Sequence, residues 1–393
     1  MTVSERGGNS ADALSELARA LEIVAENASK YDVSGEFPHD SIRTLTPTGV
    51  LAYAVPRVYG GAEKSLEELV AATELVGAAD PAVGLLVLWN FTNHFALRRP
   101  DNPWPERIRE EILRSAVTDG ALINGLTVER DLGSLGRGGS PATRATPAPG
   151  GGWFITGEKA YGTGISGLSW IPVVATTVED QPRLGVFLVR PSTPDWEILE
   201  TWNHLGLRAS DTQSVRFTDA YVPADDVLEL VEAGPNRIVN IAMLVAPVLL
   251  AANYNGVSVS IRNWLVEYLH HRVPTNLGAP LSTVPRIIDR VGEIESLLLT
   301  SESLTKQAAR NIDDGIEHDP SLGQLAKHVA TTTALRISEI ALDLTGNPGL
   351  ARENPLERHH RNAIVGRVHF PQSDFIITSL GRRTLQRDKA VAQ

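Results

Sequence analysis

The sequence contains no cysteine among its 393 residues. Disulfide bonds, thiolate metal sites and a cysteine nucleophile are therefore excluded together. We expect a cytoplasmic protein, because disulfides are typical of oxidising compartments. An excess of basic residues is also missing, since the formal net charge is -11. Because nucleic-acid-binding surfaces carry a basic stripe, we expect no nucleic-acid partner.

Long hydrophobic runs are missing as well. The longest, Ile241–Ala252, contains Pro247 and is shorter than the roughly 20 residues that a membrane helix needs, which favours a buried core helix. The start of the chain, Met1–Ser10, is polar and has no apolar segment typical of a secretory signal. The sequence therefore predicts a soluble protein without a membrane partner.

The spacing of apolar residues divides the chain into three regions. Residues 1–117 show helical periodicity, and residues 231–393 show longer helical patterns with short links. Residues 118–230 contain β-rich segments between Gly, Pro and Asp turns, namely Trp153–Thr156, Trp170–Thr177, Leu184–Val189 and Ser214–Thr218. The predicted fold is mainly α, with an N-terminal helical domain, a central β-domain (a barrel or sandwich) and a C-terminal four-helix bundle.

Several local details follow from the same patterns. In the last predicted strand, Val215 and Phe217 alternate with polar residues, so this strand should bury one face. Residues 284–298 and 322–344 are predicted to form helices of the bundle. The segment Gly133–Gly152, rich in Gly, Pro and Thr, is predicted to be a loop.

A glycine motif at Gly162–Gly167 matches the dinucleotide-binding pattern G-x-G-x-x-G. That site requires a helix that opens at the last glycine, where backbone amides meet a pyrophosphate. The residues that follow, Ser169–Val174, instead have a strand pattern with an early proline. We therefore expect no nicotinamide-binding fold in this chain.

Six short motifs follow one another along the chain: Val55–Gly61 (V-P-R-V-Y-G-G), Leu126–Glu129 with Gly133-Ser134, Trp153–Lys159 (W-F-I-T-G-E-K), Leu205–Pro223, Tyr268–Arg272 and Asn354–Ala363. Their patterns and order resemble the acyl-CoA dehydrogenase superfamily over nearly the whole chain, from about Leu14 to Leu385. The resemblance implies the family's three-domain fold and a bound flavin.

The resemblance also implies which side chains contact the flavin. A flavin needs hydrogen bonds at its ring edge, an apolar wall and a guanidinium for its phosphate. The implied residues are Asn124, Thr127 and Thr163 at the ring, Ser134 in the flavin-contacting loop, Trp202 as the wall, and Arg272 at the phosphate. Thr163 as a turn cap and Trp202 as a core residue remain alternatives.

In this family the bundle of one subunit completes the flavin site of a neighbour. The resemblance therefore implies a homotetramer or a dimer, in which Arg272 acts across the subunit boundary. The apolar run Ile241–Ala252 is expected to contribute apolar side chains to the subunit interface. The adjacent pairs His270-His271 and His359-His360 point apart on a helix, so no metal site is expected.

Two positions distinguish this sequence from the dehydrogenases it resembles. Removal of the α-proton of an acyl-CoA needs a carboxylate base. The resemblance places one such base at Phe370 and the other close to Ala246; Phe370 cannot accept a proton, and no carboxylate lies between Asn236 and Asn263. The adenine-binding turn is also degraded, at Asp343–Gly349, which favours FMN and leaves FAD possible.

Three segments are similar to the two-component flavin-dependent monooxygenases of the superfamily: Thr163–Trp170, Arg272–Leu281, and His369 with Pro371. The resemblance implies FMNH2 supplied by a separate reductase, a C4a-(hydro)peroxyflavin formed with O2, and oxygenation of a small organic substrate.

Two histidines are the catalytic candidates. His369 is the first, because an imidazole exchanges protons near neutral pH and a histidine occupies this place in the monooxygenase branch. His94 is the second, with a core histidine as the alternative. A FAD-dependent acyl-CoA dehydrogenase or oxidase, and a non-catalytic flavin-binding relative, are the competing functions.

Overall fold

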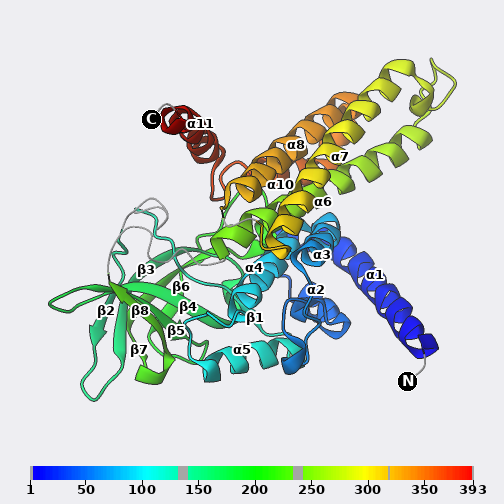
Figure 1. Ribbon diagram of the computed structural model, residues 1–393. Helices are drawn as coiled ribbons and strands as arrows, with labels where there is room; N and C mark the ends of the chain where they lie inside the picture. The colour runs from blue at the N-terminus through cyan, green and yellow to red at the C-terminus, as the bar shows by residue number, and fades with distance from the viewer. Residues whose placement is uncertain (1–2, 132–139, 233–241, 317–318, 392–393) are drawn as a thin grey trace. The chain divides into compact units, whose positions relative to one another are not determined.

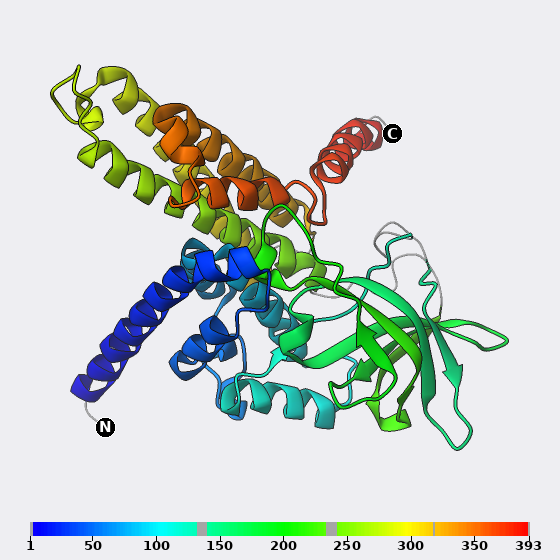
Figure 2. The ribbon, with the colours of Figure 1, turned by 180° about the vertical axis from the view of Figure 1, so that it is seen from behind.

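The structure is a computed structural model that describes residues 3–131, 140–232, 242–316 and 319–391 (Figure 1, Figure 2). The chain forms two compact units, which we describe separately. The sheet unit comprises Met1–Lys64, Leu85–His204 and Arg208–Ala242, and the bundle unit comprises Ser65–Gly84, Leu205–Leu207 and Met243–Gln393. Along the chain, helices are followed by a sheet and then by helices again, which confirms the predicted fold class.

The helices of the sheet unit are α1 (Val3–Ser34), α2 (His39–Leu45), most of α4 (Pro81–Leu97) and α5 (Glu106–Thr118). In α5 the buried residues Ile108, Ile112 and Ala116 recur every four positions and form one apolar face. This face joins a core cluster that contains Trp170 and other apolar residues of β4, β5 and β8. The Trp170 indole also donates a hydrogen bond to Ser115 Oγ (2.9 Å), which ties α5 to the sheet.

The central region forms one eight-stranded sheet in the order β6-β7-β3-β2-β4-β5-β8, with β1 beside β4. β1 and β2 pair with β4 in parallel, and the other pairs are antiparallel. The strands are β1 (Leu122–Ile123), β2 (Arg144–Pro147), β3 (Trp153–Gly162), β4 (Leu168–Thr177), β5 (Arg183–Val189), β6 (Trp196–Ile198), β7 (Gln213–Val222) and β8 (Val227–Glu232).

The four strands predicted from the sequence lie within β3, β4, β5 and β7. Val215 and Phe217 are buried and Arg216 between them is exposed, as the alternation predicts. The predicted loop Gly133–Gly152 contains β2, which departs from the prediction. This strand is short and polar, and its pairing with both β3 and β4 stabilises it, which local sequence does not reveal.

The glycines of Gly162–Gly167 have structural roles in a tight turn. β3 ends at Gly162, a three-residue 3-10 turn covers Ile165–Gly167, and β4 begins at Leu168. Gly164 has a positive φ of 78°, and a Cβ on Gly167 would overlap the ring of Phe37. No α-helix opens at this motif, so the dinucleotide interpretation is excluded.

The helices of the bundle unit are α3 (Leu66–Ala79), α6 (Ala242–His271), α7 (Pro285–Asp313), α8 (Ser321–Thr345), α9 (Asn347–Leu350), α10 (Leu356–Val365) and α11 (Ser373–Val391). Both views show the long helices α6, α7 and α8 running side by side. α7 packs on α8 and α3, and α8 also packs on α10. The predicted helices at 284–298 and 322–344 lie in α7 and α8.

α6 is a long apolar helix of this unit and continues through Pro247. Among the described helices, Leu244–His271 within α6 has the length and composition of a membrane span, with a mean hydropathy of 1.5. However, 83% of its most apolar stretch is buried inside the protein. Burial inside the protein therefore accounts for its hydrophobicity.

Candidate functional site

One end of the sheet unit brings together three of the predicted flavin-binding residues. Asn124 follows β1, and its Nδ2 donates to the backbone oxygen of Thr163 (3.1 Å), which follows β3. Gly162 pairs with Gln213 at the start of β7. Gln213 Oε1 in turn accepts the backbone N–H of Trp202 (2.7 Å). Asn124, Thr163 and Trp202 are thus linked by hydrogen bonds and strand pairing at the ends of β3 and β7.

The Thr163 side chain belongs to a buried hydroxyl chain. The Thr212 hydroxyl lies 3.1 Å from Thr163 Oγ1 and 2.7 Å from Ser210 Oγ. Trp202 is only half-buried and stacks on His204, with ring centroids 3.7 Å apart and an interplanar angle of 18°. Trp202 is therefore not a core residue, and its ring can serve as one wall of a planar ligand site.

Thr127 lies between two short backbone pairings. Leu126 pairs with Val173 of β4, and Val128 pairs with Ala160 of β3. Thr127 itself is exposed. It is therefore fixed at the surface of the sheet, where its hydroxyl is accessible. Ser134, which was also predicted to bind the flavin, lies outside the described residues.

His94 is fully buried on α4, and neither ring nitrogen has a hydrogen-bond partner among the described residues. Burial lowers the pKa of His94 to about 3, so the ring is neutral at physiological pH. One helical turn earlier, Asn90 accepts the N–H of Ile123 (3.0 Å), the residue before Asn124. Most buried side-chain nitrogens in proteins have a hydrogen-bond partner, so His94 stays a candidate for ligand contact.

The structure adds a buried ion pair that the sequence did not predict. Lys159 Nζ lies 2.7 Å from Glu129 Oε1, and both side chains are almost completely buried. The same carboxylate accepts hydrogen bonds from the Thr143 hydroxyl (2.6 Å) and from the backbone N–H groups of Thr143 and Ala142. Glu129 is thus the anchor of the segment that carries Thr127.

The electrostatics of this pair follow from its burial. Burial alone would raise the pKa of Glu129, but hydrogen bonds from Lys159 and Thr143 and the charge of Lys159 hold it below the ordinary value of 4.5. Burial lowers the pKa of Lys159, although Glu129 opposes that effect. Glu129 ends the motif Leu126–Glu129 and Lys159 ends the motif Trp153–Lys159. Their places in these two motifs are the sequence feature from which the pairing could have been predicted.

In the bundle unit, His369 lies in the turn between α10 and α11. Its Nδ1 is 3.1 Å from the hydroxyl of Tyr254 on α6, and the backbone oxygen of His369 accepts a hydrogen bond from Lys327 Nζ (2.7 Å). Burial and the neighbouring Lys327 charge lower the pKa of His369 below 6.5. The imidazole is therefore neutral at physiological pH and can act as a hydrogen-bond donor or acceptor.

The two positions that the resemblance assigns to the dehydrogenase base, Phe370 and Ala246, carry apolar side chains. Phe370 is half-buried and packs its ring against Phe375, with centroids 5.7 Å apart. Ala246 is buried in α6. Neither position can remove a proton from a substrate.

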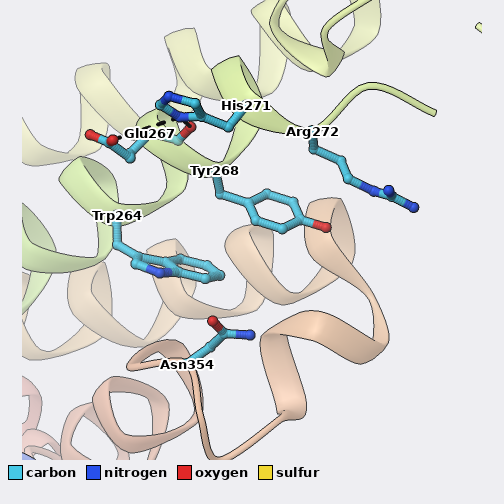
Figure 3. A pocket seen from close by; sticks show the side chains of 6 residues that line it. All are labelled: Trp264, Glu267, Tyr268, His271, Arg272 and Asn354. Atoms are coloured by element: carbon cyan, nitrogen blue, oxygen red, sulfur yellow. Dashed lines mark hydrogen bonds and ion pairs between the residues drawn. The ribbon is translucent and has the colours of Figure 1, made fainter.

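Arg272 lies just beyond α6, beside a hollow lined by Trp264, Tyr268, His271, Glu267 and Asn354 (Figure 3). The Trp264 and Tyr268 rings stack, with centroids 5.3 Å apart, and the Arg272 side chain extends past Tyr268. Arg272 is exposed, and within the described residues its guanidinium has no hydrogen-bond or ion-pair partner. A charged group next to stacked aromatics can bind an anionic aromatic ligand.

Solved structures with a similar fold cover nearly the whole chain. KijD3, solved in complex with dTDP, has a TM-score of 0.83 at 25% identity and covers 95% of this chain and 96% of its own. TdsC from Paenibacillus sp. A11-2, solved with FMN and indole, has a TM-score of 0.84 at 20% identity and covers 96% and 97%. Butyryl-CoA dehydrogenase from Megasphaera elsdenii has a TM-score of 0.82 at 21% identity and covers 95% and 98%, so the fold is that of acyl-CoA dehydrogenase-like proteins.

Sequence comparisons identify the family. The models of the acyl-CoA dehydrogenase N-terminal and C-terminal domains match residues 11–97 and 248–373, together more than half of the chain. YdbM of Bacillus subtilis is 27% identical over 95% of this chain and 96% of its own. Cyclohex-1-ene-1-carbonyl-CoA dehydrogenase of Geobacter metallireducens is 24% identical over 92% and 94%. The chain belongs to the acyl-CoA dehydrogenase family of flavin-dependent oxidoreductases.

Proposed function

We propose that the protein is a flavin-dependent monooxygenase that uses reduced FMN and O2 to oxygenate a small organic substrate. The observation that carries this proposal is the pair of residues His369 and Phe370 in the turn between α10 and α11. A neutral histidine, His369, is held there by Tyr254 and Lys327, and Phe370 occupies the place of the dehydrogenase base. The site therefore offers an imidazole for proton exchange and lacks the carboxylate for α-proton removal.

The donor set of the chain fits a flavin. Asn124, Thr127 and Thr163 would hold the ring edge, Trp202 would cover a ring face, and Arg272 would bind the phosphate. Reduced FMN, supplied by a separate reductase, would provide the electrons for the reaction with O2. FMN is favoured because the adenine-binding turn Asp343–Gly349 has lost the family's pattern.

The two histidines would have different roles. His369 would exchange a proton with the bound substrate or oxygen species through its free ring nitrogen. The buried His94, with open nitrogens in apolar surroundings, would donate a hydrogen bond without carrying charge. Rapid mixing of the FMNH2-loaded protein with O2 tests the proposed function, and we propose the cytoplasm as its location.

The role of Arg272 gives a first prediction. Arg272→Ala should weaken the binding of reduced FMN by about 1.5–3 kcal/mol, the contribution of a hydrogen bond to a charged group. Equilibrium titration of the apoprotein with FMNH2 under anaerobic conditions measures this loss. Arg286→Ala, at another exposed arginine of the bundle unit, is the matched control and should bind as the wild type does. Unchanged affinity in Arg272→Ala would show that the phosphate assignment is wrong.

The assembly gives a second prediction. Within the run Ile241–Ala252, which was expected to offer interface residues, Val248–Ala252 are buried within the chain and leave almost no exposed surface for a partner. Exposed Ile288 and Leu299, three turns apart on one side of α7, are better candidates. We expect a dimer or tetramer at micromolar concentration in sedimentation velocity, weakened in an Ile288→Asp, Leu299→Asp double variant. A monomer in the wild type would contradict the proposal that Arg272 acts across a subunit boundary.

A second candidate function is an acyl-CoA dehydrogenase. The similarity to the cyclohexenecarbonyl-CoA dehydrogenase favours it. In that case, anaerobic addition of an acyl-CoA to the FAD-loaded protein should bleach the flavin stoichiometrically. We expect no bleaching, because Phe370 and Ala246 cannot accept the α-proton. Failure to retain either flavin would instead favour a non-catalytic relative.

A further inference from the structure

The turn that carries His369 is held by a single buried lysine. Lys327 Nζ, on α8, donates hydrogen bonds to the backbone oxygens of Gly366 (3.0 Å), His369 (2.7 Å) and Pro371 (3.0 Å). An ammonium group has three N–H donors, so each one is used on this turn. The backbone on both sides of His369 is therefore fixed to α8.

Lys327 is a costly choice for packing alone. Its side chain is fully buried, and in the part of the chain that the structure describes no carboxylate forms an ion pair with it. An apolar side chain of similar size would avoid the desolvation cost of a buried charge. A lysine at this position instead donates three hydrogen bonds to backbone oxygens of residues 366–371, the segment that contains His369.

A second group acts on the imidazole itself. Tyr254 is fully buried, and its hydroxyl has no hydrogen-bond partner among the described residues other than His369 Nδ1. Burial raises the pKa of Tyr254, so the phenol keeps its proton. A buried O–H group whose only neighbour is a ring nitrogen is satisfied when it donates to that nitrogen. His369 Nδ1 is then the acceptor, and the ring proton resides on Nε2.

The turn at residues 366–371 also packs closely against its neighbours. A Cβ added to Gly366 would lie 2.8 Å from Thr331 of α8 and 3.0 Å from the ring of Tyr254. The turn therefore approaches both helices closely, and its place is determined by α6 and α8 together.

We propose that Lys327 and Tyr254 are positioning residues for His369: Lys327 fixes the backbone of residues 366–371, and Tyr254 selects the tautomer that presents Nε2–H. The inference rests on the proposed function, because that function explains why His369 needs a fixed position: proton exchange with an oxygen species requires a well-placed neutral N–H donor. The tautomer and the position of the ring can nevertheless be measured without flavin, substrate or turnover.

The test is NMR of the full-length protein with 15N-labelled histidine. The 15N shifts of an imidazole distinguish a protonated from an unprotonated nitrogen, and His369→Gln identifies the His369 signals by their loss. In the wild type we expect a single neutral species with Nε2 protonated. Tyr254→Phe should convert it to a mixture of tautomers. Lys327→Met should broaden the His369 signals and raise its pKa, because a neighbouring positive charge is removed.

Two variants control for unrelated effects. Tyr161→Phe, at an exposed tyrosine, and Lys306→Met, at a surface lysine of α7, should leave the His369 spectrum unchanged. If Lys327→Met does not fold, Lys327→Gln keeps two N–H donors without the charge, and we expect less broadening of the His369 signals with a similar rise in the His369 pKa.

Three results would overturn the inference. A proton on Nδ1 of His369 in the wild type contradicts the role of Tyr254, as does an unchanged tautomer in Tyr254→Phe. A wild-type His369 spectrum in a folded Lys327 variant contradicts the role of Lys327. If the protein proves not to be a monooxygenase, these spectra still decide the inference, so the two failures are distinguishable.

Discussion

His369→Ala should lower the rate of product formation by about a hundred- to ten-thousandfold while reduced FMN still binds. The predicted flavin contacts Asn124, Thr163, Trp202 and Arg272 are unchanged in this variant, so flavin affinity should be close to that of the wild type. Oxygen would still oxidise the reduced flavin, but a larger share of the consumed oxygen than in the wild type should be released as hydrogen peroxide. Product and peroxide must therefore be measured together, as a coupling ratio.

The matched control is His270→Ala, an exposed histidine at the end of α6. It should have wild-type coupling. Phe370→Glu adds the opposite test, because it places a carboxylate where the dehydrogenases keep their base. If this variant gains acyl-CoA dehydrogenation while His369→Ala loses nothing, the protein is a dehydrogenase that has lost its base. Equal coupling in the wild type and His369→Ala would remove the catalytic role of His369.

Glu129→Gln should reduce the free energy of unfolding by about 3–5 kcal/mol, the cost of breaking a buried ion pair by removing one partner. The loss arises because Lys159 remains buried without a counter-charge, and the anchoring of Ala142 and Thr143 weakens. Urea or thermal unfolding measures it. Lys159→Met should cost less, because Glu129 keeps its three other donors. The control is Glu158→Gln on β3, the strand that also carries Lys159, and this change removes an exposed ion pair with Arg216. It should cost less than about 1 kcal/mol of unfolding free energy.

This pair also predicts how stability depends on pH. The pKa of Glu129 is lower in the folded protein than the ordinary 4.5 of an unfolded chain. Its contribution is therefore fully present above that value and is lost as the pH falls through the folded pKa. Wild-type stability should fall more steeply than that of the Glu129→Gln, Lys159→Met double variant when the pH is lowered below about 4.5. Parallel pH profiles for the two proteins would contradict the buried-pair account.

The sequence predicted those features that depend on local pattern. The strands within β3, β4, β5 and β7 carry their own alternation and turn residues, and α7 and α8 carry their own apolar stripes. The false dinucleotide motif at Gly162–Gly167 could be rejected because the strand that follows it is visible in the same short stretch.

Features that depend on partners distant in the chain were not predictable in this way. Glu129 and Lys159 meet because Val128 pairs with Ala160, and neither charge is unusual in its own segment. Lys327 lies on α8 without any motif, and only the fold brings it to the turn of His369. The strand β2 lies in a sequence typical of loops and forms through its neighbours in the sheet.

The exchange of a carboxylate base for a histidine is the central claim, and the reaction of the reduced protein with oxygen tests it most directly. The protein is loaded with FMNH2 under anaerobic conditions and mixed with O2 in a stopped-flow spectrometer, with free FMNH2 as the reference. We expect a transient absorbing species that is neither reduced nor oxidised FMN, and its decay should yield coupled product when a substrate is present. Direct reoxidation to FMN without such a species, together with bleaching of the FAD-loaded protein by an acyl-CoA, would contradict the account.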